Sequence, residues 1–356
     1  MSVVVEESAL AALIRECFAG LGLGTNDAAA VAQVCVYANL RGIDSHGLAR
    51  VPAYMRKVHA GLAGGTERMS AGAGGGALCR LDGGRALGPA AAVKGVDLAI
   101  ELAERHGVGV VGVGDSTHFG AAGFYVRRAA RRRLVAVAAT NGPANMAPHG
   151  ASEAFLGTNA IAIGAPLGRH GEFVLDMSSS IVARGRIMRA DAFAAPIEPG
   201  LAIAADGQPT TDARAALAGA VLPLGGAKGS GLAFAVCMLA GVLGGAGFDD
   251  EVVPMHGSSD RPQNVGHVFA VIDPWRLADP ADALARVEQL VDRLHALRPA
   301  AGFDRVRFAG ERGDEQAAAR RVHGIPLAPA ELEATARACE ECGLGQVADR
   351  ARALAV

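Results

Sequence analysis

The middle of the chain alternates between short apolar runs and longer amphipathic stretches, and this alternation restricts the fold more than any other feature of the sequence. Helices are expected over Gly88–His106 and near residues 119–133, 181–195, 229–243 and 281–297. Strands are expected at residues 108–113, 134–140, 172–178 and 267–273, and at Ala160–Pro166. An order in which helices separate strands is typical of α/β proteins. We therefore expect an α/β fold with a sheet of at least five strands of mixed direction.

Both ends of the chain have helical patterns instead. Helices are expected over Glu7–Gly20 and residues 26–40, and Pro329 is placed to begin the final helix, because the first helical position needs no N–H group. A glycine-rich piece at residues 63–76 changes the composition abruptly and predicts a boundary near residue 70. The expected organisation is a helical part made of residues 1–70 and 280–356, and a mixed α/β part made of residues 71–279.

Composition and charge exclude several classes of function. The 356 residues include 34 basic and 36 acidic side chains, for a formal net charge of −2, so neither nucleic acid nor an anionic membrane is expected as a partner. The start of the chain lacks the pattern of a secretory signal, which predicts a cytoplasmic protein. Residues 229–248 carry no charge, but six of them are glycine, and we expect a buried helix against the sheet rather than a membrane span. The six scattered cysteines predict reduced thiols, and Cys339 and Cys342, although spaced as C-x-x-C, are expected to be surface or packing residues rather than a metal or redox pair.

A glycine motif at residues 107–112 matches the G-x-G-x-x-G pattern of Rossmann dinucleotide sites. In that fingerprint the glycines end a strand and open a helix, and an acidic residue follows about 20 positions later. Here they follow a helix and begin a strand, and the residues at that distance are Arg131–Arg133. The context therefore argues against a Rossmann site.

The loop at residues 114–120 (GDSTHFG) follows the strand that those glycines begin. Ligands of α/β proteins gather where strands end and helices start, so His118 is placed where a substrate can reach it. The alternative is a capping loop in which Ser116 or Thr117 serves the helix and the imidazole faces solvent.

A second polar loop, at residues 41–47 (RGIDSHG), is followed by Arg50, four positions beyond His46. If this stretch is helical, the two side chains share a face and offer a proton donor beside a guanidinium that suits a carboxylate. Adjacent Asp44, Ser45 and His46 are no hydrolase triad, because a triad is a relation in space. The alternative is a turn that ends a helix, with His46 on the surface.

Glycine- and amide-bearing turns include Asn141, His149 and Thr158, and the segment at residues 225–231 (GGAKGSG) opens a helix. Backbone N–H groups at a helix start, with Lys228 nearby, suit an anion such as a pyrophosphate; alternatively, these glycines only permit close packing. No spacing predicts a metal site among the candidate histidines His46, His118, His149, His256 and His267.

Taken together, the motifs resemble those of the type-2 malate/L-lactate dehydrogenases, a family that includes ureidoglycolate, sulfolactate and diketogulonate enzymes. The similarity runs from about residue 9 to residue 344 and rests on nine motifs in the same order, which are RGIDSHGLARVPAY, GVGDSTHFGAAGFY, ATNGPANMAPHG, FLGTNAIAIGAP, VLDMSSSIVARGRI, PLGGAKGSGL, RPQNVGHVF, FAGER and HGIPL. The resemblance implies a mixed-sheet NAD(P)-binding domain that is not a Rossmann fold, a helical domain built from both chain ends, and a homodimer.

The resemblance also implies roles for individual residues. His46 and His118 are the candidates for proton transfer, and Ser45 supports His46. Arg50 would bind the substrate carboxylate, and His149 and Thr158 would line the pocket. The residues expected to bind NAD or NADP are His118, Gly120, Thr140, Asn141, Asp176, Met177, Ser178, Ser179, Ser180, Ile181, Val182, Arg186, Lys228, Gly229, Ser230, Gly310, Glu311 and Arg312.

Two positions depart from the family pattern. Ala160 stands where the family usually has proline, which loosens a turn without removing a reacting group. Arg186 stands where the hydroxyacid enzymes usually have lysine and the cyclic-imine reductases have an acidic residue. A basic side chain at this position disfavours the cyclic-imine (piperideine-carboxylate) reductase interpretation.

The sequence thus predicts reversible hydride transfer between NAD(P) and a small 2-hydroxy or 2-oxo carboxylate, with a histidine as acid/base because its pKa lies near working pH. The alternatives are a metal-dependent hydrolase or lyase built from the histidines and Asp44, a diketogulonate reductase, and a catalytically silent ligand-binding relative.

Overall fold

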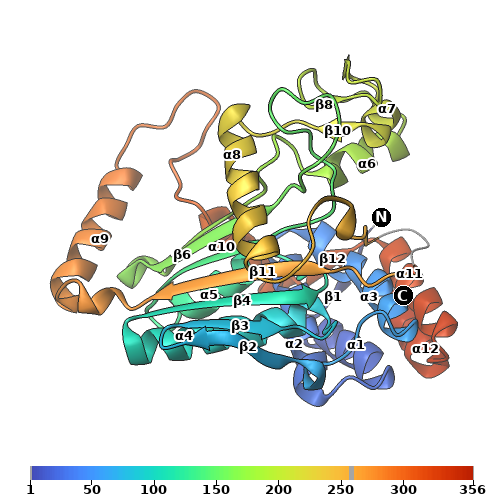
Figure 1. The fold of residues 1–356 in the computed structure, drawn as a ribbon, viewed down its shortest axis with the longest axis horizontal. Coiled ribbons are helices and arrows are strands. Elements are labelled where there is room, and N and C mark those ends of the chain that lie inside the picture. The colour runs from blue at the N-terminus through green and yellow to red at the C-terminus, as the bar shows by residue number, and fades with distance from the viewer. Residues whose placement is uncertain (1, 256–259, 356) are drawn as a thin grey trace.

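A seven-stranded mixed sheet forms the centre of the computed structural model, which describes residues 2–255 and 260–355 (Figure 1). In spatial order its strands are β2 (Ser70–Gly75), β3 (Leu78–Asp82), β4 (Val108–Ser116), β11 (Val265–Ile272), β5 (Val135–Thr140), β6 (Ala160–Pro166) and β7 (Glu172–Met177). Only β3 and β4 pair in parallel, and the other neighbours are antiparallel. This confirms the prediction of an α/β fold with a sheet of mixed direction.

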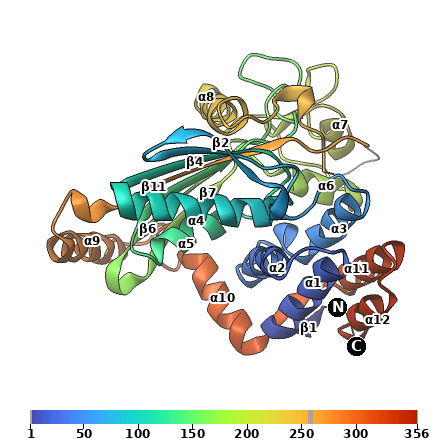
Figure 2. The ribbon, with the colours of Figure 1, turned by 60° about the horizontal axis from the view of Figure 1, so that its bottom comes forward.

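Helices cover both faces of the sheet (Figure 2). On one face lie α4 (Gly88–His106) and α5 (Gly123–Ala130); on the other lies α8 (Ala227–Val236), continued by a π-helical segment, η5 (Cys237–Val242). The glycines of the false Rossmann motif serve this packing, since a Cβ at Gly109 would lie 2.1 Å from the carbonyl oxygen of Ala99 on α4. Those glycines follow α4 and enter β4, as predicted.

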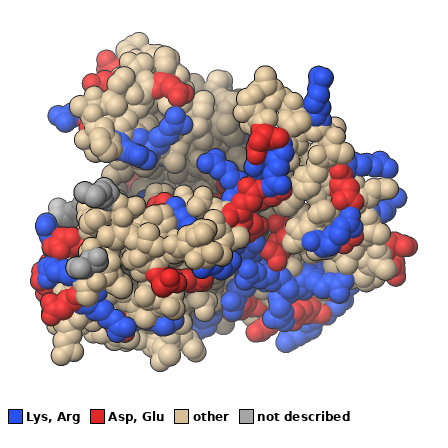
Figure 3. All heavy atoms as spheres, turned by 180° about the vertical axis from the view of Figure 1, so that it is seen from behind, with Lys and Arg blue, Asp and Glu red and all other residues tan. Residues whose placement is uncertain are grey.

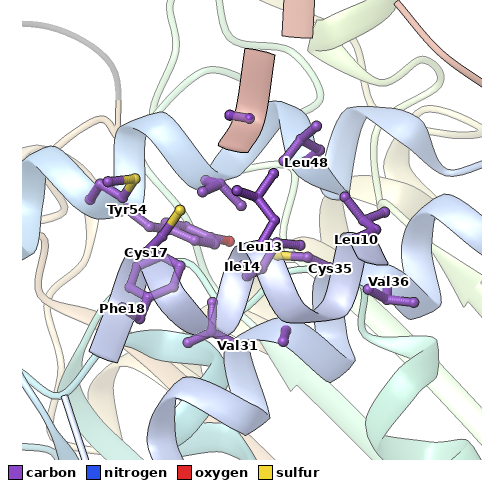
Figure 4. Packing of buried hydrophobic residues seen from close by; sticks show 14 of the residues in the cluster. Leu10, Leu13, Ile14, Cys17, Phe18, Val31, Cys35, Val36, Leu48 and Tyr54 are labelled. Atoms are coloured by element: carbon purple, nitrogen blue, oxygen red, sulfur yellow. The ribbon is translucent and has the colours of Figure 1, made fainter. Parts of the chain in front are cut away.

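The two chain ends form one helical core. It contains α1 (Glu7–Gly20), α2 (Thr25–Leu40), α3 (Val51–His59), α11 (Pro329–Glu341) and α12 (Gly345–Ala353), and the strands β1 (Val3–Val5) and β12 (Ile325–Leu327) pair beside it. Figure 4 shows its side chains, with Cys17 and Phe18 of α1 close to Tyr54 of α3. All six cysteines are free, and the Cys17 and Cys339 sulfurs lie 3.7 Å apart in this core.

A separate lobe stands above the sheet. It holds α6 (Arg184–Ala192), α7 (Ala213–Ala218) and a small sheet of β8 (Ala202–Ile203), β9 (Pro209–Thr210) and β10 (Ala220–Val221), around a hydrophobic cluster of its own. The chain enters the lobe after strand β7. Val174 of β7 packs in the cluster of the main sheet, and Val182, five residues after the strand ends, packs in the cluster of the lobe. The sequence interpretation did not foresee this third cluster.

The remaining helices are α9 (Pro280–His295) and α10 (Glu311–His323). Although α9 falls in the expected helical part, it stands apart from the terminal helices in Figure 1. It is held to the β6–β7 turn by ion pairs from Arg169 to Glu288 and Asp292.

Some expected elements differ from the structure. The helix expected from residue 119 begins only at Gly123, because Gly120 has a φ of +84° that no right-handed helix contains. Part of the glycine-rich boundary piece is strand β2. The uncharged helix at residues 229–243 was expected to be buried; Ala233 and Ala240 do face the protein, but Phe234, Met238, Leu239, Val242 and Leu243 are 43–69% exposed. Within residues 2–255 and 260–355, no helix has the length and apolarity to span a membrane.

Candidate active site

The His46 loop leaves the C-terminal end of α2 and does not form one helix. Asp44–His46 and Leu48–Arg50 are two separate 3-10 turns, divided at Gly47 (φ −92°, ψ −134°). The idea that His46 and Arg50 share a helix face is therefore wrong, although the two side chains remain close enough for the Arg50 charge to affect His46.

Asn39, at the end of α2, holds this loop in place. Its Oδ1 accepts a hydrogen bond from the Leu48 N–H at 2.8 Å, and its Nδ2 donates to Asp44 at 3.1 Å. The Asp44 carboxylate also pairs with Arg320 of α10 at 2.7 Å. Asp44 is thus committed to holding the loop between α2 and α10.

The structure brings the two candidate histidines together from different halves of the molecule. The His46 and His118 rings lie 5.4 Å apart between centroids, inclined by 34°. The Ser45 hydroxyl lies 3.0 Å from His46 Nδ1, as expected for a supporting residue. Both rings are partly exposed to solvent, so the pair can meet a ligand.

His118 is held by two side chains that the sequence interpretation missed. The Tyr54 hydroxyl lies 2.6 Å from His118 Nδ1, and the backbone N–H of His118 donates to Gln263 Oε1 at 3.0 Å. Tyr54 lies in the same motif as Arg50, one turn further along, and Gln263 lies in the motif RPQNVGHVF. In the sequence, a tyrosine among apolar residues is typical of a core position. Only the folded structure shows that the Tyr54 hydroxyl reaches His118, just after the end of β4.

The surroundings keep these groups neutral. Burial, and secondarily the positive charge of Arg50, lowers the pKa of His46 to about 4. Burial also raises the pKa of Tyr54 well above its usual value, so its hydroxyl keeps its proton. At neutral pH, His46 is therefore an uncharged imidazole beside a guanidinium.

A second set of candidates gathers at the edge of the sheet, and we call Gly120, Gly123, Asp176 and Gly310 the edge cradle. The Gly123 N–H at the start of α5 donates to the Asp176 carboxylate at 2.7 Å. Gly310 begins α10 with a φ of +100°, and a Cβ there would lie 3.1 Å from the backbone N of Val174, two residues before Asp176 on β7. Gly120 follows His118 by two residues, and its N–H donates to His118 Nδ1 at 3.3 Å, which links this set to the histidine pair.

The edge cradle has the chemistry of a dinucleotide site. A Cβ at Gly123 would lie 2.9 Å from the Tyr37 hydroxyl and 3.1 Å from Asp176 Oδ2, so only glycine lets the backbone approach this closely. Asp176 is open to solvent on one side, and burial on its other sides raises the pKa of its carboxyl. A carboxylate suits ribose hydroxyls, and glycines let a ligand come close to the backbone. These residues therefore fit a nicotinamide dinucleotide.

A third set lies where the sheet meets the lobe. The His149 N–H donates to the Ser230 hydroxyl at 3.0 Å, and Ser179 donates to the Thr158 carbonyl through both its N–H (2.8 Å) and its hydroxyl (2.9 Å). A Cβ at Gly229 would lie 2.7 Å from the Ser179 carbonyl oxygen. Seen from behind, the molecule is deeply hollowed beside the lobe, with basic side chains inside the hollow (Figure 3).

Several predicted cofactor residues use their side chains internally. Thr140 bonds to His267 (2.9 Å) and to the Gly266 carbonyl, while Asn141 bonds to Gly247 and Gly266. Glu311 is bound by His295 and Arg305. At these positions, only backbone atoms remain for a ligand.

The other predicted cofactor residues differ in exposure. Ser178 and Ser180 bond within their own turn, Val182 is buried in the lobe core, and Met177 is half-buried. Ile181, Lys228 and Arg312 are accessible, and Arg186 is exposed on α6, where it pairs with Glu198.

A third histidine near the site is built into the sheet. His267 is fully buried, its ring stacks on Phe119 at 4.7 Å between centroids, and burial lowers its pKa to about 3. His256 lies outside the described residues. Within the described part of the chain, no group of three or more His, Cys, Asp or Glu side chains is arranged to hold a metal ion.

Comparisons with known proteins agree with this geometry. Residues 5–335 match the model of the malate/L-lactate dehydrogenase family. The L-sulfolactate dehydrogenase of Methanocaldococcus jannaschii is 34% identical over 93% of this chain and 95% of its own. A solved structure of sulfolactate dehydrogenase from that organism superposes with a TM-score of 0.88 at 32% identity, covering 98% of this chain and 99% of the other.

Two further relatives carry cofactors in their names. The (2R)-3-sulfolactate dehydrogenase (NADP(+)) of Chromohalobacter salexigens is 37% identical over 73% of this chain and 78% of its own. The ureidoglycolate dehydrogenase (NAD(+)) of Escherichia coli O157:H7 is 32% identical over 91% of this chain and 92% of its own.

Proposed function

Because the chain belongs to the malate/L-lactate dehydrogenase family, we propose that it transfers a hydride between NAD(P) and a small 2-hydroxy carboxylate, with His118 as the acid/base. At the level of the family, it is an NAD(P)-dependent dehydrogenase of small hydroxy acids. The observation that carries the finer proposal is the pair of imidazoles, 5.4 Å apart, beside Arg50 and next to the edge cradle.

The nicotinamide cofactor, when bound, supplies the hydride acceptor in oxidation and the donor in reduction. Gly120, Gly123, Asp176 and Gly310 would hold it, the Asp176 carboxylate accepting from ribose hydroxyls and the glycines letting the cofactor come close to the backbone. Lys228 and Ser230, at the start of α8, are proposed to assist from the lobe side.

Arg50 is proposed to bind the substrate carboxylate. A guanidinium presents two parallel N–H donors that match the two oxygens of a carboxylate. Since His46 is neutral at working pH, it adds no second charge, and its proposed role is to hydrogen-bond the substrate beside Arg50. Ser45 fixes the His46 ring from Nδ1.

His118 is proposed to take the hydroxyl proton in oxidation and return it in reduction. Tyr54 holds Nδ1, so proton transfer falls to Nε2. A phenol hydroxyl both donates and accepts; it therefore serves the ring whether Nδ1 is bare or protonated. The lowered pKa of His46, about 4, makes that imidazole a weak base and favours His118 as the proton carrier.

His149 and Thr158 are proposed to line the substrate pocket from the lobe side. We expect substitutions at these two positions to change which hydroxy acid the protein accepts. The homodimer remains a proposal as well. The exposed apolar side of α8 and η5 supports it, because a patch of that kind commonly marks a protein–protein contact.

Nicotinamide absorbance tests the proposal. Purified protein would be assayed with malate, lactate, sulfolactate, ureidoglycolate and ketogulonate, each with NAD and NADP, before and after chelator treatment. Turnover of at least one hydroxy acid that survives the chelator is expected. Activity that disappears with chelator and ignores nicotinamide would instead support the metal-dependent hydrolase or lyase.

A further inference from the structure

A groove rich in arginine lies beside α2 and α5, and Tyr37, which lines it, stands between the groove and the edge cradle. It encloses about 580 Å³ and is bordered by α1, α2, α4, α5 and α10. Its charged lining comprises two acids, Glu7 and Asp97, and seven arginines, which are Arg15, Arg41, Arg127, Arg128, Arg131, Arg132 and Arg321. The whole chain has a net charge of −2, so this concentration of positive charge is local.

The carboxylates around the groove do not neutralise it. Five of them, Glu7, Asp97, Glu104, Glu172 and Asp314, pair with its arginines within 4 Å. Arg131 only shares Glu172, at 3.9 Å. Arg15 makes no ion pair with any described residue. The side chains of Arg15 and Arg131 are both exposed. The excess positive charge therefore sits at Arg15 and Arg131, on the mouth of the groove.

The floor of the groove holds two arginines that are almost fully buried. The side chains of Arg41 and Arg127 are 6% and 5% exposed, and both pair with Asp314 of α10. In the described part of the chain, the buried Nε of each has no hydrogen-bond partner. A buried donor without an acceptor is costly, and an anion is the ligand that offers acceptors to guanidinium groups.

Apolar groups complete the lining. Arg41 lies over the Tyr37 ring at 4.1 Å, and Phe124 meets Tyr37 edge to face. A neighbouring cavity of about 640 Å³ shares Asp97 and Arg128, and its other charged residues are Asp27, Lys94 and Glu101. Acids outnumber bases there, so an anion is favoured on the arginine side. The volume falls within the usual range for small-molecule sites, about 300–1,000 Å³.

We propose that this groove binds a small organic anion with two or more negative charges, such as a polyphosphate ester or a polycarboxylate, at a site separate from the cofactor. The proposal does not rest on the dehydrogenase activity, because the groove shares no lining residue with the edge cradle or the histidine pair. Arg41 begins the loop that carries His46, and its partner Asp314 lies in the first turn of α10 beside Gly310. A ligand held here therefore contacts the supports of both functional sets.

Binding of inorganic tripolyphosphate and of citrate tests the site. Each probe would be titrated by calorimetry at physiological ionic strength, with the full-length protein alone and saturated with NADH, which occupies any phosphate subsite of the cradle. We expect one binding event that persists with NADH and weakens at least 10-fold in the double variant Arg15→Ser/Arg131→Ser. Both side chains are exposed, so the variant should fold normally.

A matched control carries the same charge change elsewhere. Arg286 and Arg298 are exposed on and after α9, outside the groove. Arg286→Ser/Arg298→Ser should bind the probes within 2-fold of the wild-type protein. Absence of binding, loss of binding on adding NADH, or equal weakening in both double variants would overturn the proposal.

Discussion

The helical core of the chain termini and the central sheet contribute different chemistry to the same site. The helical core supplies His46, Arg50 and Tyr54, from a loop and a helix packed among apolar side chains. The sheet supplies His118 and most of the edge cradle, at the ends of β4 and β7 and the start of α5, and Gly310 joins the cradle from the start of α10. The contrast teaches that the proposed substrate-binding charge and the proposed cofactor-binding residues come from separate layers, and that the Tyr54–His118 contact joins these layers.

The largest effect is expected from removing His118, the proposed proton carrier on the sheet side. His118→Ala should lower kcat/KM by about 10²- to 10⁴-fold, the usual contribution of a general acid/base. Steady-state nicotinamide absorbance measures it. His323→Ala, at the exposed end of α10, is the control and should leave kcat/KM unchanged. Near-normal turnover in His118→Ala would contradict this role and indicate that the acid/base belongs to the helical core, where His46 lies.

The next effect concerns stability at low pH and compares His267 in the sheet with His46 in the loop. Because His267 is buried with a pKa lowered to about 3, the unfolded chain binds a proton that the folded chain does not between about pH 6.5 and pH 3. Stability is therefore lost as the pH falls through that window, by a few kcal/mol at most.

Urea unfolding from pH 7 to pH 3.5 measures this loss. His267→Gln should flatten the pH dependence of the free energy of unfolding. His46→Asn should flatten it less and over a narrower window, because His46 is partly exposed and its pKa is about 4. Equal slopes in the wild-type protein and His267→Gln would contradict the assignment of a neutral, buried His267.

A smaller effect tests the carboxylate-binding group on the helical side. Arg50→Lys should raise KM for the hydroxy acid by about 10- to 100-fold with a lesser change in kcat, since a single ammonium does not reproduce the two-pronged guanidinium. Arg56→Lys, on the surface of α3 where Arg56 pairs with Glu341, is the matched control. A KM change of the same size in both variants would show that Arg50 does not bind the substrate carboxylate directly.

The smallest effect is expected from breaking the Tyr54–His118 contact, which joins the helical core to the sheet. Tyr54→Phe should lower kcat by about 10-fold, the value of one hydrogen bond near 1.4 kcal/mol, and shift the pH profile of kcat/KM, because the partner of His118 Nδ1 is lost. Tyr125→Phe removes another buried hydroxyl, which bonds to the Phe119 carbonyl, and should leave the profile in place. Identical profiles for both variants and wild type would rule out a positioning role for Tyr54.

Local patterns predicted much of the secondary structure. The bounds of α1, α4 and β6 match the expected ranges, because strong periodicity and flanking glycine or proline define such elements locally. The start of α5 and the break at Gly47 were missed, since both depend on backbone conformations at single glycines. The division into residues 1–70 with 280–356, and 71–279, remains a prediction.

The candidate site also contains some residues that the motifs predicted and others that only the structure showed. The motifs predicted roles for His46, His118, Arg50 and Asp176, but they gave no sign that Thr140 and Asn141 use their side chains inside the sheet. Tyr54 and Gln263 escaped notice because an isolated tyrosine or glutamine has no spacing that signals a role. Their partners lie 64 and 145 residues away along the chain.

By itself, the sequence determined which residue types the protein has for chemistry and which stretches become helix or strand, because both depend on short-range pattern. Only the tertiary structure decided that His46 meets His118, that Asp176 meets Gly123, and that arginines from four helices and their flanking turns line one groove. The physical reason is that these contacts join layers of the fold, and their distances are determined by how a helical core made from both chain ends packs against the sheet.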